Sequence, residues 1–135
     1  MRAFQFQIIR RWLAAGGIVL AACSDGTTAP GRDPEIINTT DNFQYQITDI
    51  QGFSGTQSYS WSNTGTTATV DQSASVASGS VSLVLLDATG AQVYSRSLAD
   101  NGTYSSSAGT AGIWTVRVTY NAADATVNFR VDKAN

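Results

Sequence analysis

The chain has 135 residues, of which eight are Lys or Arg, ten are Asp or Glu and only 13% are charged. It contains no histidine and a single cysteine, which excludes a Ser-His-Asp triad, a Cys-His pair, a His-ligated zinc and an internal disulfide. A hydrophobic content of 42% is sufficient for one core, so this length predicts one folded domain.

Residues 1–22 have the pattern of a signal peptide. Arg2, Arg10 and Arg11 stand in a segment without acids, and residues 12–22 follow as an uncharged apolar run. Eleven residues rise about 16 Å as a helix, roughly half the thickness of the hydrocarbon core of a bilayer. The segment is therefore predicted to be a cleaved signal helix and not a membrane span.

The apolar run ends in Leu20-Ala21-Ala22-Cys23, which resembles the lipobox of bacterial lipoprotein signal peptides. The resemblance implies cleavage between Ala22 and Cys23, a diacylglyceryl group joined to the Cys23 sulfur by a thioether, and acylation of the new terminus by a fatty acid such as palmitate. Two or three acyl chains hold a protein at a membrane essentially permanently. The alternatives are a free or buried thiol, or an ordinary secretory signal in which Cys23 is incidental.

The resemblance also carries an expectation about location. Ser24 follows Cys23 where enteric lipoproteins retained in the inner membrane typically have Asp, so a lipid anchor in the outer membrane is expected if the organism has two membranes. Cleavage leaves 113 residues with five basic and ten acidic side chains, a net charge of −5. Such a surface repels polyphosphate, so nucleic acid is not an expected partner. With no polybasic patch, membrane association must come from the lipid.

Residues 23–42 are predicted to form a flexible linker. This segment contains both prolines of the chain, and its only bulky apolar residues are Ile36 and Ile37. The two isoleucines either begin the first strand or tuck beneath the domain, which is predicted to occupy residues 43–135.

From residue 43 onward the hydrophobic period is two, and Gly, Asn, Asp and Ser separate the apolar runs. This pattern predicts an antiparallel β-sandwich of about seven or eight short strands, Ig-like or jelly-roll-like, and not a closed barrel. The expected strands cover residues 43–51, 57–63, 67–72, 80–87, 91–98, 112–121 and 125–132.

The last two predicted strands are expected to form a hairpin. If Tyr120 pairs with Ala125, every inward pair is apolar and every outward pair is polar, so this register is well specified. The same register places Arg117 and Arg130 on one outward face. They are candidates for binding a carboxylate or phosphate, with a solvated face near Asp132 as the alternative.

Residues 87–90, Asp-Ala-Thr-Gly, are predicted to form a type I turn. Asp is expected to cap backbone N–H groups from its first position, and Gly90 to adopt a left-handed conformation. The strand before this turn is apolar on both faces. Val84 and Leu86 on its second face are expected either to contact a partner or to be covered by loops or the N-terminal segment of the same chain.

Residues 79–90, which end in this Asp-x-x-Gly turn, and the downstream Gly112-Ile113-Trp114 with its alternating strand resemble the pre-peptidase C-terminal type of bacterial β-sandwich. The resemblance spans residues 79–131. It implies a non-catalytic accessory module of the kind found on exported bacterial proteins.

The residues needed for common hydrolytic mechanisms are absent or badly placed. The only glutamate, Glu35, falls in the predicted linker, and the only lysine, Lys133, lies three residues from the C-terminus. The sequence has no Ser-x-x-Lys and no Gly-x-Ser-x-Gly motif to activate a serine. We therefore expect a protein that is not an enzyme and has no cofactor.

Two binding chemistries stay open. Exposed rings at Tyr59, Trp61 and Tyr104 would stack on sugars, although the alternation of Trp61 and Trp114 with Ser or Thr fits core packing for these two. Oxygen ligands from Asp87, Asp100 and Asp124 would hold calcium if they gathered at one end of the sandwich, with turn capping as the alternative.

These observations predict a non-enzymatic, lipid-anchored lipoprotein of the cell envelope that displays a β-sandwich for a structural or protein-interaction role. A carbohydrate-binding module that uses exposed aromatics is the alternative, and a calcium-dependent accessory module is a weaker one. The expected contacts are the membrane through Cys23 and an envelope protein or glycan.

Overall fold

The computed structural model describes residues 33–134, and the predicted signal peptide and Cys23 lie outside this part. All regular elements within it are strands: β3 (Glu35–Thr39), β4 (Asn42–Asn63), β5 (Ala68–Gln72), β6 (Ser75–Leu86), β7 (Gln92–Ser97), β8 (Gly102–Ser105) and β9 (Gly112–Lys133). Every pairing between them is antiparallel. The predicted all-β antiparallel class is confirmed. No helix in residues 33–134 is long and apolar enough to cross a membrane.

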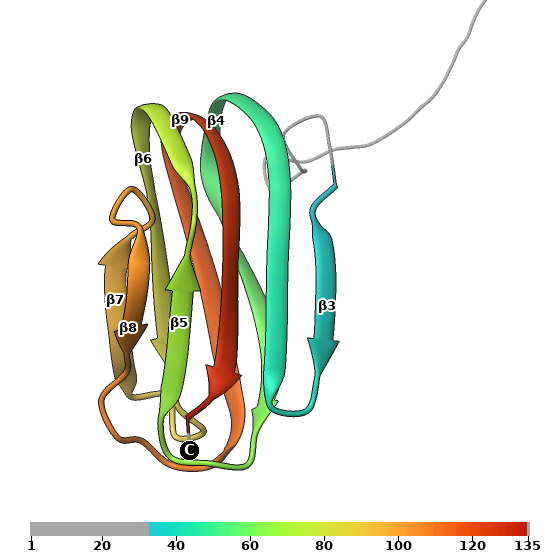
Figure 1. Ribbon diagram of the computed structural model, residues 1–135, viewed down its shortest axis with the longest axis vertical. Helices are drawn as coiled ribbons and strands as arrows, with labels where there is room; N and C mark the ends of the chain where they lie inside the picture. The colour runs from blue at the N-terminus through green and yellow to red at the C-terminus, as the bar shows by residue number, and fades with distance from the viewer. Residues whose placement is uncertain (1–32, 135) are drawn as a thin grey trace, which may run out of the picture.

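Two long strands build both layers of the molecule. Strands β4 and β9 have 22 residues each, pair with each other from end to end, and turn over together with β6 at the top of Figure 1. One layer contains β3, the first half of β4, the second half of β9, β5 and β8. The other contains the remaining halves of β4 and β9 with β6 and β7. A single seven-stranded sheet is thus folded over on itself as a sandwich.

The predicted hairpin between residues 112–121 and 125–132 is wrong, because both segments belong to the continuous strand β9. Tyr120 pairs with Gly55 and Val81, whereas Ala125 pairs with Ile50 and Val76. Residues 43–51 and 57–63 are likewise one strand, β4. The turn-forming residues between these pairs of segments bend a strand and do not reverse it. The predicted alternation of inward and outward side chains within each segment of β9 is confirmed.

The bends depend on residues with positive φ. These are Asp49 and Gly52 in β4, Gly79 in β6 and Ala122 in β9, and the strand registers shift at the same places. The carboxylate of Asp124 accepts hydrogen bonds from the Gly52 backbone N–H at 2.6 Å and from the Ser78 hydroxyl at 2.9 Å. One side chain of β9 therefore ties all three bent strands together.

Aromatic side chains fill the space between the layers. The rings of Tyr45 and Phe129 stack with centroids 5.1 Å apart, and Trp61 meets Trp114 edge-on at 5.9 Å. The hydroxyl oxygens of Tyr45 and Tyr120 lie 2.5 Å apart, and this hydrogen bond joins the first half of β4 to the first half of β9. The two ring contacts join neighbouring strands within a layer, and the Tyr45–Tyr120 hydrogen bond links one layer to the other.

Ile36 and Ile37 belong to the first strand, as one of the two expectations for them has it. Strand β3 starts at Glu35, inside the expected linker of residues 23–42, and pairs with the first residues of β4. Ile36 packs against the core while Ile37 is 53% exposed. The polar residues that resembled a linker form the β3–β4 turn, in which Asp41 has a φ of 67°. The Asp41 carboxylate also accepts hydrogen bonds from the Thr64 N–H at 2.8 Å and from its hydroxyl.

Residues 81–86 of β6 are apolar on both faces, as predicted, but the two faces differ in burial. Val81, Leu83 and Leu85 are buried in the core, whereas Val84 and Leu86 are half-buried on the outer surface. Val84 lies between Arg117 of β9 and Ser95 of β7 in the sheet. Neighbouring side chains of the same chain therefore flank it.

Candidate binding face

The outer surface of the layer that contains β3 and β5 carries a set of planar polar side chains, which we call the polar face. Alternation places them there: the side chains between buried Phe43, Tyr45 and Ile47 of β4, and between buried Val127, Phe129 and Val131 of β9, point outward. The polar face consists of Glu35, Gln44, Gln46, Asp71, Asn128 and Arg130.

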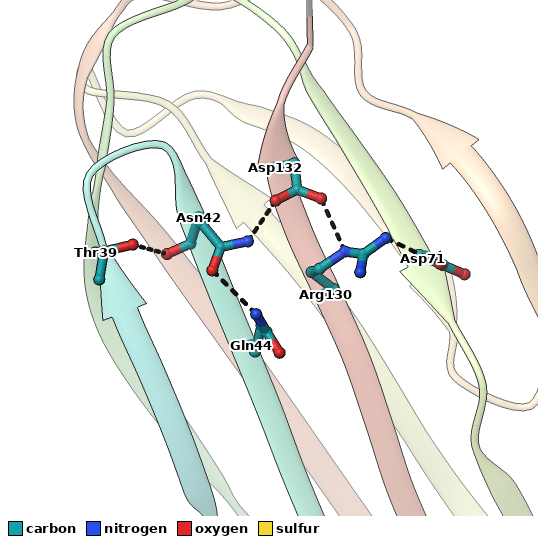
Figure 2. Close-up of polar contacts among 6 residues, drawn as sticks. All are labelled: Thr39, Asn42, Gln44, Asp71, Arg130 and Asp132. Atoms are coloured by element: carbon teal, nitrogen blue, oxygen red, sulfur yellow. Dashed lines mark hydrogen bonds and ion pairs between the residues drawn. The ribbon is translucent and has the colours of Figure 1, made fainter.

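Strand register arranges these residues in rows across the sheet. Gln44 lies opposite Arg130, and Arg130 lies opposite Asp71. The Arg130 guanidinium is held between two carboxylates, by an Nε to Asp132 Oδ2 contact of 2.9 Å and an Nη2 to Asp71 Oδ2 contact of 3.5 Å (Figure 2). Asn42 extends this network by donating to Asp132 and accepting from Gln44. The positive charge of Arg130 is therefore neutralised within the face.

A second row has side chains that are not engaged by the protein. Gln46 lies opposite Asn128 on one side and opposite Glu35 on the other, and all three side chains are exposed. Within residues 33–134 none of the three makes a side-chain hydrogen bond or ion pair. These two amides and one carboxylate present their donors and acceptors to solvent.

The polar face is hollowed rather than flat. Two open hollows, of about 320 Å³ and 140 Å³, share Gln44, Gln46 and Asn128 in their linings. A third, of about 160 Å³, adjoins them at Glu35 and Gln46. The largest falls at the lower end of the range of small-ligand sites, about 300–1,000 Å³. Exposed Ile37 lines the hollow of about 140 Å³ and contributes an apolar patch beside the amides of Gln44, Gln46 and Asn128.

The two arginines predicted to share one outward face are separated. Arg130 belongs to the polar face, whereas Arg117 lies in the first half of β9 on the other layer, opposite Ser58 and Val84. Its Nε donates to the Ser58 hydroxyl at 3.3 Å. The prediction that the two arginines share a face is wrong because it was derived from the predicted hairpin. The bend in β9 places the two halves of this strand in different layers. The structure therefore does not bring the two guanidinium groups together around one anion.

The aromatic candidates are occupied by the fold. Trp61 is 1% exposed and packs against Trp114, so its ring is not available for stacking on a sugar, and this corrects the expectation that it lies exposed. Tyr59 is half-buried against Phe43 and Tyr45. Tyr104 is also half-buried, with the Arg96 guanidinium 3.7 Å above its ring centroid. The alternative interpretation, core packing, is confirmed for Trp61 and Trp114.

Asp87 has the turn-capping role predicted for it. Its carboxylate accepts hydrogen bonds from the Thr89 hydroxyl and the N–H groups of Thr89, Ala91 and Thr110, at 2.7–2.9 Å. These donors, the Thr89 hydroxyl first, lower the pKa of Asp87 to about 2. Gly90 has a φ of 89°, as expected. In the described part of the chain, Asp87, Asp100 and Asp124 do not gather with one another into a group that fits a metal ion.

The chain matches no protein-family model, and no curated protein matches its sequence. The candidate site therefore stands on the geometry of its own residues.

Sequence reasoning missed five members of the polar face: Glu35, Gln44, Gln46, Asp71 and Asn128. The available signal was the pair of alternating segments at residues 43–47 and 127–131, each with polar residues between buried ones. That signal places the polar residues outward but does not say which strands are neighbours. The juxtaposition of β4 with β9 needed the structure.

Proposed function

We propose that this protein is a non-enzymatic lipoprotein of the cell envelope, anchored through lipid on Cys23, whose β-sandwich acts by display and binding. The observation that carries the proposal is the sequence Leu20-Ala21-Ala22-Cys23 directly upstream of a domain built only from strands. The first strand begins at Glu35, twelve residues after Cys23, a separation that an extended chain spans in at most about 43 Å. The domain would therefore stay close to the membrane surface, at the outer membrane in an organism with two membranes.

The engagement of the carboxylates supports a binding role rather than a catalytic one. Among the acids of residues 33–134, Asp41 and Asp87 have a lowered pKa, and in each case donors from neighbouring turns lower it, the Thr64 backbone N–H for Asp41 and the Thr89 hydroxyl for Asp87. Such groups stay ionised as acceptors that fix loops, whereas a general acid needs a raised pKa. These two carboxylates therefore serve the fold.

The polar face supports the display of a recognition surface. It lies on the layer that includes β3, the first described strand after Cys23 in the sequence. Within residues 33–134, the side chains of Glu35, Gln46 and Asn128 in this face make no hydrogen bond or ion pair. A partner of the envelope, protein or glycan, would meet these groups without any change in the fold.

Phase separation of solubilised cells in a detergent that clouds on warming tests the anchor. The wild-type protein is expected in the detergent phase, and the Cys23→Ser variant either in the aqueous phase or as a longer, unprocessed chain. A matched Ser24→Ala variant should behave like the wild type. Equal partitioning of the Cys23→Ser and wild-type chains, at the same chain length, would contradict the proposal.

A further inference from the structure

We propose that the polar face is a binding site for a neutral oligosaccharide, recognised through amide and carboxylate hydrogen bonds to sugar hydroxyls and not through aromatic stacking. The inference rests on the proposed function only in assigning the protein a binding role. It names the class of ligand and the residues that contact it.

The donors and acceptors of the face match hydroxyl groups. Gln46 and Asn128 each present a carbonyl oxygen and an NH₂ group with no partner in the described part of the chain, and Glu35 beside them presents only acceptors. A sugar hydroxyl both donates and accepts, so adjacent hydroxyls can pair with one amide in two hydrogen bonds. Exposed Ile37, which lines the same hollow, offers an apolar contact for the C–H groups of a ring.

The charges of the face select against anions. Arg130 is its only cation and is already paired with Asp71 and Asp132, while Glu35 adds a further negative charge. A phosphate or uronate ligand would meet more carboxylates than guanidinium groups and would be repelled. A neutral ligand meets no such penalty, and the fixed guanidinium can still donate to its oxygens.

The shape of the face indicates a short chain of sugars and not a single ring. The three hollows join through Glu35, Gln44, Gln46 and Asn128, and together they cross strands β3, β4, β9 and β5. Three spacings between adjacent strands extend about 14 Å. The sheet fixes the backbone positions of Glu35, Gln46 and Asn128, and a ligand has to order only the exposed side chains.

The test titrates three neutral hexasaccharides into the protein, purified from whole cells solubilised in an amine-oxide detergent without a sugar headgroup. Two probes are the α-1,4 and β-1,4 hexamers of glucose, and the third is the β-1,4 hexamer of N-acetylglucosamine. Amide NMR shifts report the site, and a hexamer of galacturonic acid is the anionic comparison. At least one neutral hexamer is expected to shift amides of β3, β4, β9 and β5 around the polar face, and to bind more tightly than the acidic one.

Variants locate the contacts. Gln46→Ala and Asn128→Ala should each weaken binding about tenfold, as expected when a partnered hydrogen bond is lost, and Gln46→Glu should do the same while keeping the length of the side chain. The matched control is Gln92→Ala, an exposed glutamine of β7 on the other layer, which should bind normally. Three results would each overturn the proposal: no shift with any neutral hexamer, equal or tighter binding of the acidic hexamer, or equal losses with Gln92→Ala. Because binding is measured in detergent, the outcome is independent of whether Cys23 carries lipid.

Discussion

A Cβ atom on Gly79 would lie 2.1 Å from the carbonyl oxygen of Ala122. Gly79 and Ala122 mark the bends of β6 and β9, with φ values of 69° and 47°, and the two strands pass each other there at a distance that only glycine permits. The fold of the sheet into two layers therefore depends on the absence of a side chain at one position of β6.

Substitution of Gly79 tests this relationship. Gly79→Ala should destabilise the protein by about 2–4 kcal/mol, because it adds a clash with backbone to the cost of a left-handed alanine. Gly52→Ala is the matched control, since Gly52 has a similar φ of 59° and a Cβ atom there would meet nothing within 4 Å, so this variant should cost only about 1–2 kcal/mol. Urea denaturation measures both, and equal losses of stability would show that the close approach to Ala122 has no energetic consequence.

Acid stability should depend on Asp87. Its pKa in the folded protein is about 2, below the ordinary value of 3.8, because the Thr89 hydroxyl and nearby backbone N–H groups bind the ionised form. A depressed pKa stabilises the folded state above about pH 4, and that stabilisation is lost as the pH falls from about 4 to about 2. Asp41, whose pKa is also lowered, adds to the loss in the same direction.

Urea midpoints measured between pH 6 and pH 2 check this prediction. The Asp87→Asn variant should be less stable than the wild type at pH 6, and the difference should shrink toward pH 2. The control is Asp100→Asn, which removes an exposed carboxylate 3.6 Å from Arg96 and should change the midpoint little. A gap between wild type and Asp87→Asn that stays constant over this pH range would contradict the assigned role.

Alkaline stability should depend on the buried tyrosines. Burial raises the pKa of Tyr45 well above its ordinary value of 10 and that of Tyr120 to about 12. The contribution of these tyrosines to the stability of the folded state is fully present below pH 10, where tyrosine is neutral in both the folded and the unfolded state. It is lost as the pH rises from about 10 toward 12, because the unfolded chain ionises first. The part of the tyrosinate absorbance near 295 nm that comes from Tyr45 and Tyr120 should therefore rise only with the loss of the far-ultraviolet dichroism of the sheet, and ionisation of all five tyrosines near pH 10 with the sheet intact would contradict it.

The sequence predicts which side chains point inward and which turn Asp87 caps, but not which strands are continuous. Alternation correctly assigns the inward side chains on both sides of residue 122, and the Asp87 turn has the capping that its residue types require. The same alternation does not distinguish a hairpin from a bent continuous strand, since either one keeps Tyr120 and Ala125 buried. The difference lies in the partners that β4 and β6 supply, which are more than 35 residues away.

The polar face illustrates the same limit at the level of the site. Arg130 is distinguished in the sequence by its charge, but the amides of Gln46 and Asn128 carry no sequence motif. They become a candidate site only because register places them side by side, 82 positions apart in the chain. Conversely, Trp61 has the ring that a sugar-stacking site requires, yet its position opposite Trp114 in the core makes it structural.

Mass spectrometry of the mature N-terminus tests the central claim, that this is a lipid-anchored protein, most directly. Trypsin releases residues 23–32 from a cleaved chain, because Arg32 is the first basic residue after Cys23. The account predicts that this peptide begins at Cys23 and carries a thioether-linked diacylglyceryl group with a further fatty acid on its amino group. Recovery of a peptide that spans Ala22 and Cys23, or of residues 23–32 with a free thiol, would contradict it.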